Sequence, residues 1–194
     1  MKTIVWDVDD VLNDLMRSWF EQEWLPAHPD CKMSYSDITQ NPPHSVLGIS
    51  KSEYLASLDV FRLSDKARSM KPNPDVVAWL RQTGDRFRHL ALTARPLDTV
   101  PPLAEWSFHH FGAYMRTFSV VQIRQEAHIP HYEQSKKEFL QWLNKADILI
   151  DDNQDNVESA NSIGIKGILY PQPWNTCKLT VIDTLTLLSA VCTP

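Results

Sequence analysis

The sequence predicts an α/β protein: a Rossmann-like, doubly wound parallel sheet with a small helical cap inserted after the first strand. Two observations support this fold class. Short, continuously apolar runs alternate with amphipathic segments, and residues 14–71 contain no convincing strand. Continuous hydrophobicity suits parallel strands that are covered on both faces. The expected strands are residues 3–6, 89–93, 118–123, 146–150 and 167–170.

Helix start and stop signals lie between these runs. Asn73 and Pro74 form an N-cap and first-turn pair, and Ser135 with Glu138 forms a capping box. The expected helices are residues 76–83, 139–144 and 156–163, and a glycine follows the first and third of them. Strands that alternate with helices predict right-handed crossovers in a parallel sheet.

Residues 14–71 read as short helices broken by prolines, with a second capping box, Ser50 to Glu53, before residues 54–58. We therefore expect a core domain of residues 1–13 and 72–194 and a helical cap of residues 14–71. The aromatic residues Trp19, Phe20 and Trp24 are expected to pack inside the cap, with stacking against a nucleotide base as the alternative.

The composition limits the functional classes. Of 194 residues, 43% are hydrophobic and 22% are charged, which suits a packed core. The net charge of −5 argues against a nucleic acid polymer as partner but allows a small phosphorylated metabolite. Cys31, Cys177 and Cys192 lack metal-binding spacing, so we expect reduced thiols. No signal peptide or membrane-spanning run is found, so a cytoplasmic location without a membrane partner is expected, and a homodimer is left open.

Polar residues follow the expected strands. They are Asp7, Asp9 and Asp10 after the first, Thr93, Ala94 and Arg95 after the second, and Asp151 and Asp152 after the fourth, while Lys136 and Lys137 begin a helix. Because ligands bind beyond the carboxyl ends of strands in open α/β sheets, these side chains are expected to meet at one edge. A lysine in the first turn opposes the helix dipole, which indicates an anionic neighbour.

The order of these motifs resembles the haloacid dehalogenase superfamily, in which four dispersed motifs form one phosphoryl-transfer site. The resemblance rests on the segments DVDDVL from Asp7, LTARP around Thr93, Lys136, and IDDNQDN around Asp151. It implies that Asp7 is the nucleophile that forms an aspartyl-phosphate and that Asp9 is the general acid and base. A phosphatase of this type requires Mg²⁺.

The resemblance also implies roles for the remaining residues. Asp7 and the backbone carbonyl of Asp9 would bind Mg²⁺, with Asp152 as the preferred third ligand and Asp151 as a second-shell or water-mediated one. Thr93 and the amides of Ala94 and Arg95 would hold the phosphate, and Lys136 would neutralise it, with Lys137 as the rival lysine. Arg95 would contact phosphate or leaving group, or else be a surface arginine. Asn156 stands where the family often has an acid. Asp151 and Asp152 are also candidates to cap the next helix.

The substrate is less determined. Residues 7–14 and 169–175 partly resemble the 5'(3')-deoxyribonucleotidase branch, although Asp10 and Asn13 depart from its pattern. Nucleoside monophosphates are therefore the leading expectation, and sugar phosphates or other small metabolites are the alternative. A remote alternative is a phospho-receiver or silent Mg²⁺-binding module. Four histidines, His109, His110, His128 and His131, lack a tight ligand pattern and are expected at the surface or in packing.

Overall fold

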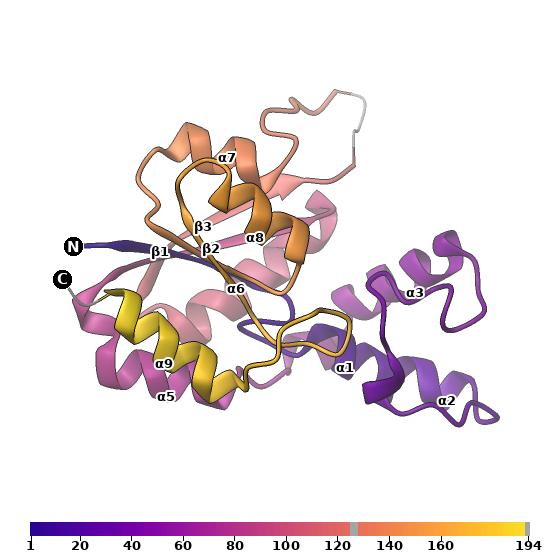
Figure 1. The fold of residues 1–194 in the computed structure, drawn as a ribbon. Coiled ribbons are helices and arrows are strands. Elements are labelled where there is room, and N and C mark those ends of the chain that lie inside the picture. Colours follow the sequence, from indigo (N-terminus) through magenta and orange to yellow (C-terminus); the bar gives the residue numbers. More distant parts are fainter. Residues whose placement is uncertain (125–127, 193–194) are drawn as a thin grey trace.

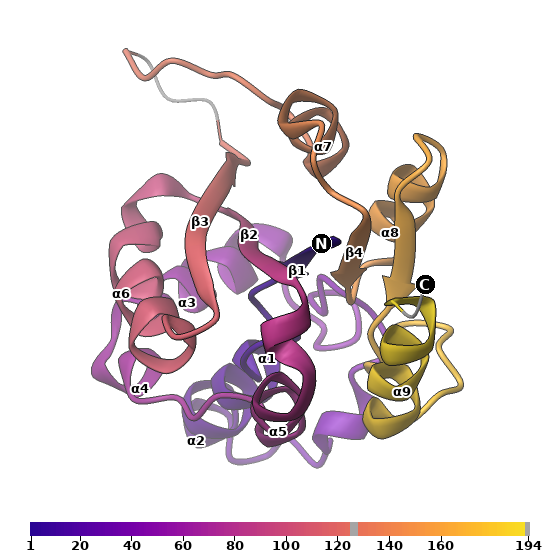
Figure 2. The same cartoon turned by 90° about the vertical axis from the view of Figure 1, so that its left-hand side faces the viewer.

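A five-stranded parallel sheet forms the centre of the molecule, which confirms the predicted α/β class. The computed structural model describes residues 1–124 and 128–192, without the side chain of Cys192. The strands are β1 (Thr3–Asp7), β2 (Arg88–Arg95), β3 (Met115–Gln122), β4 (Ile148–Asp151) and β5 (Lys166–Leu169). Their order is β3-β2-β1-β4-β5, and the labels β3, β2, β1 and β4 follow in this order from left to right in Figure 2. Phospho-receivers have a different order, 2-1-3-4-5.

Helices cover both faces of the sheet (Figure 1). The helices around the sheet are α5 (Pro74–Thr83), α6 (Val100–Phe111), α7 (Lys136–Leu143), α8 (Gln154–Asn161) and α9 (Val181–Cys192), with short 3-10 turns η3 (Gly84–Arg86) and η4 (Leu97–Thr99). Within β1, Trp6 packs in the cluster with α5, α6 and α9, whereas Val5 packs in the cluster with α7 and α8. The sheet is thus buried on both sides, as its apolar strands predict.

The ends of several elements differ from the sequence prediction. The third strand begins at Met115 rather than at residue 118, and Ile123 lies beyond its end and is 50% exposed. The second strand continues to Arg95 because Arg95 pairs with Gln122 of β3. Helix α7 starts three residues before the predicted range, with the Ser135 side chain accepting from the Glu138 backbone N–H, and α8 starts two residues early.

Two helices, α6 and α9, were not located from the sequence. Pro101 and Pro102 occupy the first turn of α6, where the missing N–H groups cost nothing. The predicted stop at Gly164 is confirmed by its left-handed backbone, with φ of +82°. The stop at Gly84 differs, because Gly84 has φ of −63° and opens a 3-10 turn.

Residues 14–71, called the cap below, are helical and contain no strand. Their elements are α1 (Leu15–Trp19), the π-helical turn η1 (Phe20–Trp24), α2 (Leu25–Ala27), the 3-10 turn η2 (Tyr35–Asp37), α3 (Lys51–Leu63) and α4 (Asp65–Arg68). The predicted helix at 54–58 is part of the longer α3, whose N-cap Ser50 accepts from the Glu53 backbone N–H. The cap has its own apolar cluster and lies beyond one end of the sheet (Figure 1).

The chain enters and leaves the cap at one place. The Asn73 backbone N–H donates to the Leu12 carbonyl at 2.8 Å, so the segment that enters the cap and the segment that leaves it lie side by side. Trp106 of α6 fixes the returning segment by donating from Nε1 to the Met70 carbonyl at 2.8 Å. The division into two domains at residues 14 and 71 stays a prediction.

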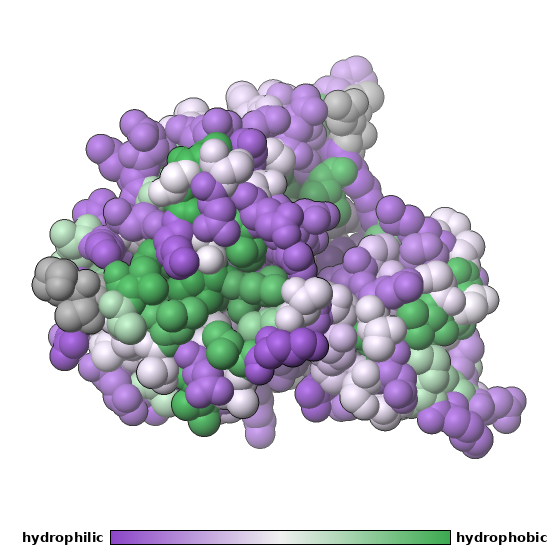
Figure 3. Space-filling model, viewed as in Figure 1, coloured by the Kyte–Doolittle hydropathy of each residue, from purple (hydrophilic) through white to green (hydrophobic). Residues whose placement is uncertain are grey.

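The surface shows where apolar side chains remain outside this core. Figure 3 shows them gathered over α9, where Ile182 is 65% and Leu187 is 41% exposed. Within the described residues, none of the helices has the length and apolar character needed to cross a bilayer.

Candidate active site

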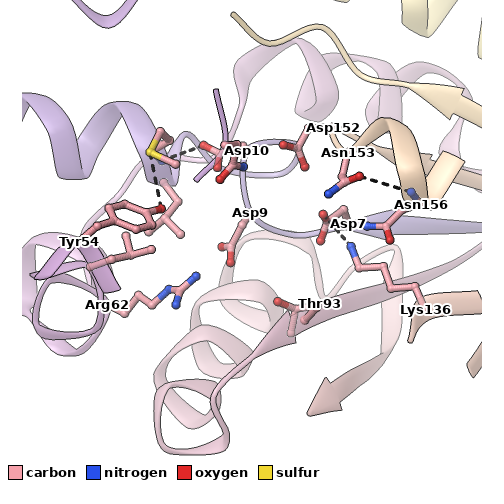
Figure 4. A pocket seen from close by; sticks show the side chains of 15 residues that line it. Asp7, Asp9, Asp10, Tyr54, Arg62, Thr93, Lys136, Asp152, Asn153 and Asn156 are labelled. Atoms are coloured by element: carbon pink, nitrogen blue, oxygen red, sulfur yellow. Dashed lines mark hydrogen bonds and ion pairs between the residues drawn. The ribbon is translucent and has the colours of Figure 1, made fainter. Parts of the chain in front are cut away.

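A polar pocket of about 190 Å³ lies where the carboxyl ends of the strands face the cap. The sheet part contributes Asp7, Asp9, Thr93, Lys136 and Asp152, and the cap contributes Tyr54 and Arg62 (Figure 4). The pairing of β1 with β2 and β4 aligns the ends of these strands, which places the side chains together. The structure therefore assembles at one edge the residues that the sequence predicted there.

Lys136 lies between two carboxylates. Its Nζ is 2.7 Å from Asp7 Oδ2 and 2.7 Å from Asp151 Oδ2, and its side chain is 3% exposed. Burial lowers the pKa of Lys136, but attraction to Asp151 and Asp7 outweighs burial and raises the pKa above its ordinary value. Lys137 is half-buried and does not line the pocket, so the anionic neighbours predicted for a first-turn lysine are those of Lys136.

Asp7, Asp151 and Asp152 form a group that fits a divalent cation. One oxygen from each lies within 4.8 Å of the others, and all three residues are buried. Burial raises the pKa of Asp7 well above its ordinary value, and Lys136 offsets this only in part. Burial, with Asp151 and Asp10 nearby, raises the pKa of Asp152 to about 8. A cation bound by oxygen ligands would relieve this cost of burying carboxylates.

Asp151 and Asp152 differ in what their oxygens already contact. Asp151 accepts from Lys136, from the Asn153 backbone N–H and from Asn156 Nδ2 at 3.1 and 3.2 Å. The Asp152 carboxylate accepts one hydrogen bond from the described residues, from Trp174 Nε1 to Oδ2, and its Oδ1 accepts none. Asp152 also lines the pocket. Asp152 therefore has an oxygen to offer, and Asp151 serves to hold Lys136 and Asn156.

Asn153, rather than either aspartate, caps α8. Its Oδ1 accepts from the backbone N–H groups of Asp155 and Asn156. The expectation that Asp151 or Asp152 caps this helix is therefore wrong. Both carboxylates lie before the cap position, because β4 continues to Asp151 and the chain needs Asp152 and Asn153 to turn into the helix.

Asp9 is bound by Arg95. Arg95 Nε donates to Asp9 Oδ2 at 2.7 Å and Nη2 donates to Oδ1 at 2.5 Å, and Arg95 is 2% exposed. Burial raises the pKa of Asp9, but the attraction and hydrogen bonds of Arg95 outweigh it, so the pKa lies below its ordinary value. Arg95 is buried, so the alternative of an exposed surface position is wrong. Its guanidinium pairs with Asp9, and contact with phosphate or leaving group stays a prediction.

Thr93 brings an unpaired hydroxyl to the pocket. Its Oγ1 is buried and has no hydrogen-bond partner among the described residues, and the residue is 1% exposed. Buried polar groups are rarely left unpaired in proteins. A ligand oxygen in the pocket would give this hydroxyl a partner.

Solved structures share this architecture. A haloacid dehalogenase-like family hydrolase from Streptococcus pneumoniae superposes with a TM-score of 0.65 at 13% identity, over 98% of each chain. A HAD-superfamily hydrolase from Ehrlichia chaffeensis gives 0.56 at 14% identity, over 100% of both chains. The chain has the haloacid dehalogenase fold. At such identities the likeness establishes the fold alone.

A third structure of this fold, a Bacillus subtilis protein described as a HAD-hydrolase bound to magnesium, gives a TM-score of 0.52 at 12% identity, over 100% of this chain and 99% of that chain. No protein-family model and no curated protein sequence matches the chain. The resemblance to the deoxyribonucleotidase branch therefore stays a prediction.

Asp10 and Asp14 do not belong to the aspartate group with metal-binding geometry in the described part of this haloacid dehalogenase fold. Asp10 adopts a left-handed backbone, with φ of 62°, where the related pattern has glycine. Its Oδ1 accepts from the Met16 backbone N–H at 2.8 Å, and its backbone N–H donates to Asn13 Oδ1. Asp10 thus shapes the turn into α1. Asp14 precedes that helix but makes no side-chain cap.

The segment after β5 supports Asp152. Trp174 Nε1 donates to Asp152 Oδ2 at 2.8 Å, and Asn175 Nδ2 donates to the backbone carbonyls of Asp152 and Tyr170. The sequence drew attention to this segment only through its nucleotidase-like pattern. The supporting contacts were missed, because nothing in the sequence relates Trp174 to an aspartate 22 residues earlier.

The cap aromatics pack as expected. Trp19 and Phe20 are fully buried, Trp24 is 4% exposed, and all three belong to the apolar cluster of the cap. Stacking against a base is therefore not their role. Arg62 and Tyr54, which do line the pocket, were missed because α3 has no motif that singles them out.

The other candidate ligands stay apart from the pocket. Within the described residues the aspartate trio is the sole group with metal-binding geometry, so the histidines form no such site. Cys31 and Cys177 are free thiols, and the side chain of Cys192 lies outside the described residues.

Proposed function

We propose that the chain is a Mg²⁺-dependent phosphomonoester hydrolase that works through an aspartyl-phosphate on Asp7. The observation that supports this most directly is the placing of Asp7 among Lys136, Asp152 and the unpaired Thr93 hydroxyl. A receiver module is disfavoured by the strand order.

In the first step an Asp7 oxygen attacks phosphorus and the bond to the leaving oxygen breaks. Asp9 gives a proton to that oxygen, while Thr93 and Lys136 stabilise the charge on the transferring phosphoryl group. Asp7, Asp152 and the Asp9 carbonyl would hold Mg²⁺, which would neutralise part of the negative charge of phosphate and carboxylates.

In the second step Asp9 takes a proton from water, and the water oxygen attacks phosphorus to free Asp7 and phosphate. The Arg95 ion pair favours ionised Asp9, which suits this base step. The acid step requires protonated Asp9, and the protonated carboxyl group is a weaker acceptor for the two Arg95 hydrogen bonds than the carboxylate. Turnover therefore includes a loosening of this bidentate contact.

Hydrolysis of p-nitrophenyl phosphate with Mg²⁺ tests the proposal. Asp7→Asn keeps the side chain's size but removes the nucleophile, so we expect turnover to fall to background. Asp98→Asn, at an exposed position in η4, is the matched control and keeps activity. Full activity in Asp7→Asn refutes the intermediate, and an inactive native chain indicates a silent Mg²⁺-binding module.

Nucleoside monophosphates lead the substrate list because residues 7–14 and 169–175 resemble the nucleotidase pattern. Two observations favour the alternative, a sugar phosphate or another small metabolite. The pocket has a volume of about 190 Å³, and among the described residues that line it the one aromatic, Tyr54, is 2% exposed. A screen of deoxyribo- and ribonucleotides against sugar phosphates decides between them by kcat/KM.

A further inference from the structure

Arg62, near the C-terminal end of α3, reaches into the pocket from the cap. Figure 4 shows its guanidinium pointing from α3 toward Asp9. The residue is 9% exposed, and its Nε is buried without a hydrogen-bond partner among the described residues. A guanidinium has five N–H donors, and the one hydrogen bond of Arg62 to another described residue runs from Nη1 to Asp59 Oδ1 at 3.0 Å.

The charge of Arg62 is incompletely neutralised. Asp59, its carboxylate partner, also binds Arg124, whose Nη2 lies 2.6 Å from Asp59 Oδ2. Two guanidinium groups therefore share one carboxylate. Arg124 follows β3, so this contact also connects the sheet part to the cap.

Asp9 does not complete the pairing. The charge of Arg62 helps to lower the pKa of Asp9, but both Asp9 oxygens already accept from Arg95. Lys136 is likewise held by Asp7 and Asp151. Lys136 is assigned above to the transferring phosphate, so Arg62 is the cation lining the described pocket that has charge and donors for a second anionic group.

We propose that Arg62 is a specificity-determining residue that binds a second anionic group on the leaving group of the substrate. The inference rests on the proposed phosphatase function and narrows its substrate class to compact phosphomonoesters that also carry a carboxylate or a second phosphate. Arg62 lies on the side of Asp9, the residue proposed to protonate the leaving oxygen, whereas Lys136 and Thr93 lie on the side of the transferring phosphate. A planar fork of donors matches either oxyanion.

Matched ligand pairs test this. 3-Phosphoglycerate and glycerol 3-phosphate differ by a carboxylate, and fructose 1,6-bisphosphate and fructose 6-phosphate differ by a phosphate. Affinities are measured by calorimetry with Mg²⁺ in the Asp7→Asn background, so that hydrolysis does not interfere. In at least one pair, we expect the ligand with two anionic groups to bind about 10- to 100-fold more tightly than the ligand with one, the effect of one charge-assisted hydrogen-bond pair.

Three variants and a control assign that preference to Arg62. Arg62→Gln removes it, and Arg62→Lys keeps part of it. Arg68→Gln is the matched control, since it removes the same charge from the cap at a side chain that is 57% exposed and does not line the pocket. Arg124→Gln leaves Asp59 to neutralise Arg62 alone, and we expect the preference to shrink several-fold.

Equal affinities within both pairs overturn the inference, as does a preference that survives Arg62→Gln. Thermal unfolding shows whether Arg62→Gln folds; if it does not, Arg62→Lys and Arg124→Gln decide. Turnover of p-nitrophenyl phosphate by the native chain is measured separately. Its absence counts against the phosphatase proposal, whereas the affinity ratios alone judge Arg62.

Discussion

Replacing Lys136 by Met removes the cation between two buried carboxylates while keeping most of the side chain's length. Asp7 and Asp151 are 9% and 0% exposed, and each lies 2.7 Å from Nζ. Removing one partner of a buried ion pair costs about 3–5 kcal/mol. In a chain of this size about 1 kcal/mol shifts Tm by 2–4 °C, so Tm is expected to fall by about 6–20 °C.

The cost depends on pH in a definite direction. Lys136 lowers the pKa of Asp7, so its loss moves that pKa further above the unfolded value. A carboxyl group whose folded pKa is raised weakens folding as pH rises above the unfolded pKa. We therefore expect the difference in Tm between native and variant chains to be larger at pH 8 than at pH 5.

Thermal unfolding followed by circular dichroism, with EDTA to remove cations, measures the effect. Lys137→Met is the matched control, because it removes the neighbouring charge from the same helix at a half-buried position outside the pocket. A Lys136→Met shift equal to that of Lys137→Met would show that the buried pair contributes nothing to stability.

Four further predictions concern the carboxylates. In EDTA, stability should fall as pH rises from about 4 to 8, by up to about 1.4 kcal/mol per pH unit for each affected group, because burial raises the pKa of Asp7 and sets that of Asp152 at about 8. Mg²⁺ should therefore raise Tm more at pH 8 than at pH 5, and the reverse order would contradict this. Trp174→Phe removes a 2.8 Å bond to Asp152 and should weaken Mg²⁺ binding about 10-fold by calorimetry; unchanged affinity would count against Asp152 as a ligand. Arg95 lowers the pKa of Asp9 in the folded chain, so the ion pair stabilises folding above the unfolded pKa of Asp9, and this stabilisation is lost as pH falls through the lowered folded pKa. Arg95→Gln removes the ion pair, so the Tm difference from the native chain should be larger at pH 7 than at pH 3.

The sheet could be predicted because its signals are local. Each strand is a short apolar run, and Ser135 and Gly164 mark helix ends by their own backbone preferences. Strand ends were less predictable, since they depend on the neighbouring strand: β2 begins at Arg88 because it pairs with Thr3. Helix α6, which has two prolines in its first turn, was not predicted.

The candidate site divides in the same way. The sequence by itself determined that Asp7 and Asp152 follow strands and that Lys136 begins a helix, and the parallel sheet then brought the three together. Only the tertiary structure decided which oxygen and nitrogen atoms of these side chains already have a hydrogen-bond or ion-pair partner. Arg95 and Asp9 are 86 residues apart, and the cap turns Arg62 into the pocket while it buries Trp19. Such contacts form when whole helices and strands pack together, so a local stretch of sequence does not show which distant residue a side chain will contact.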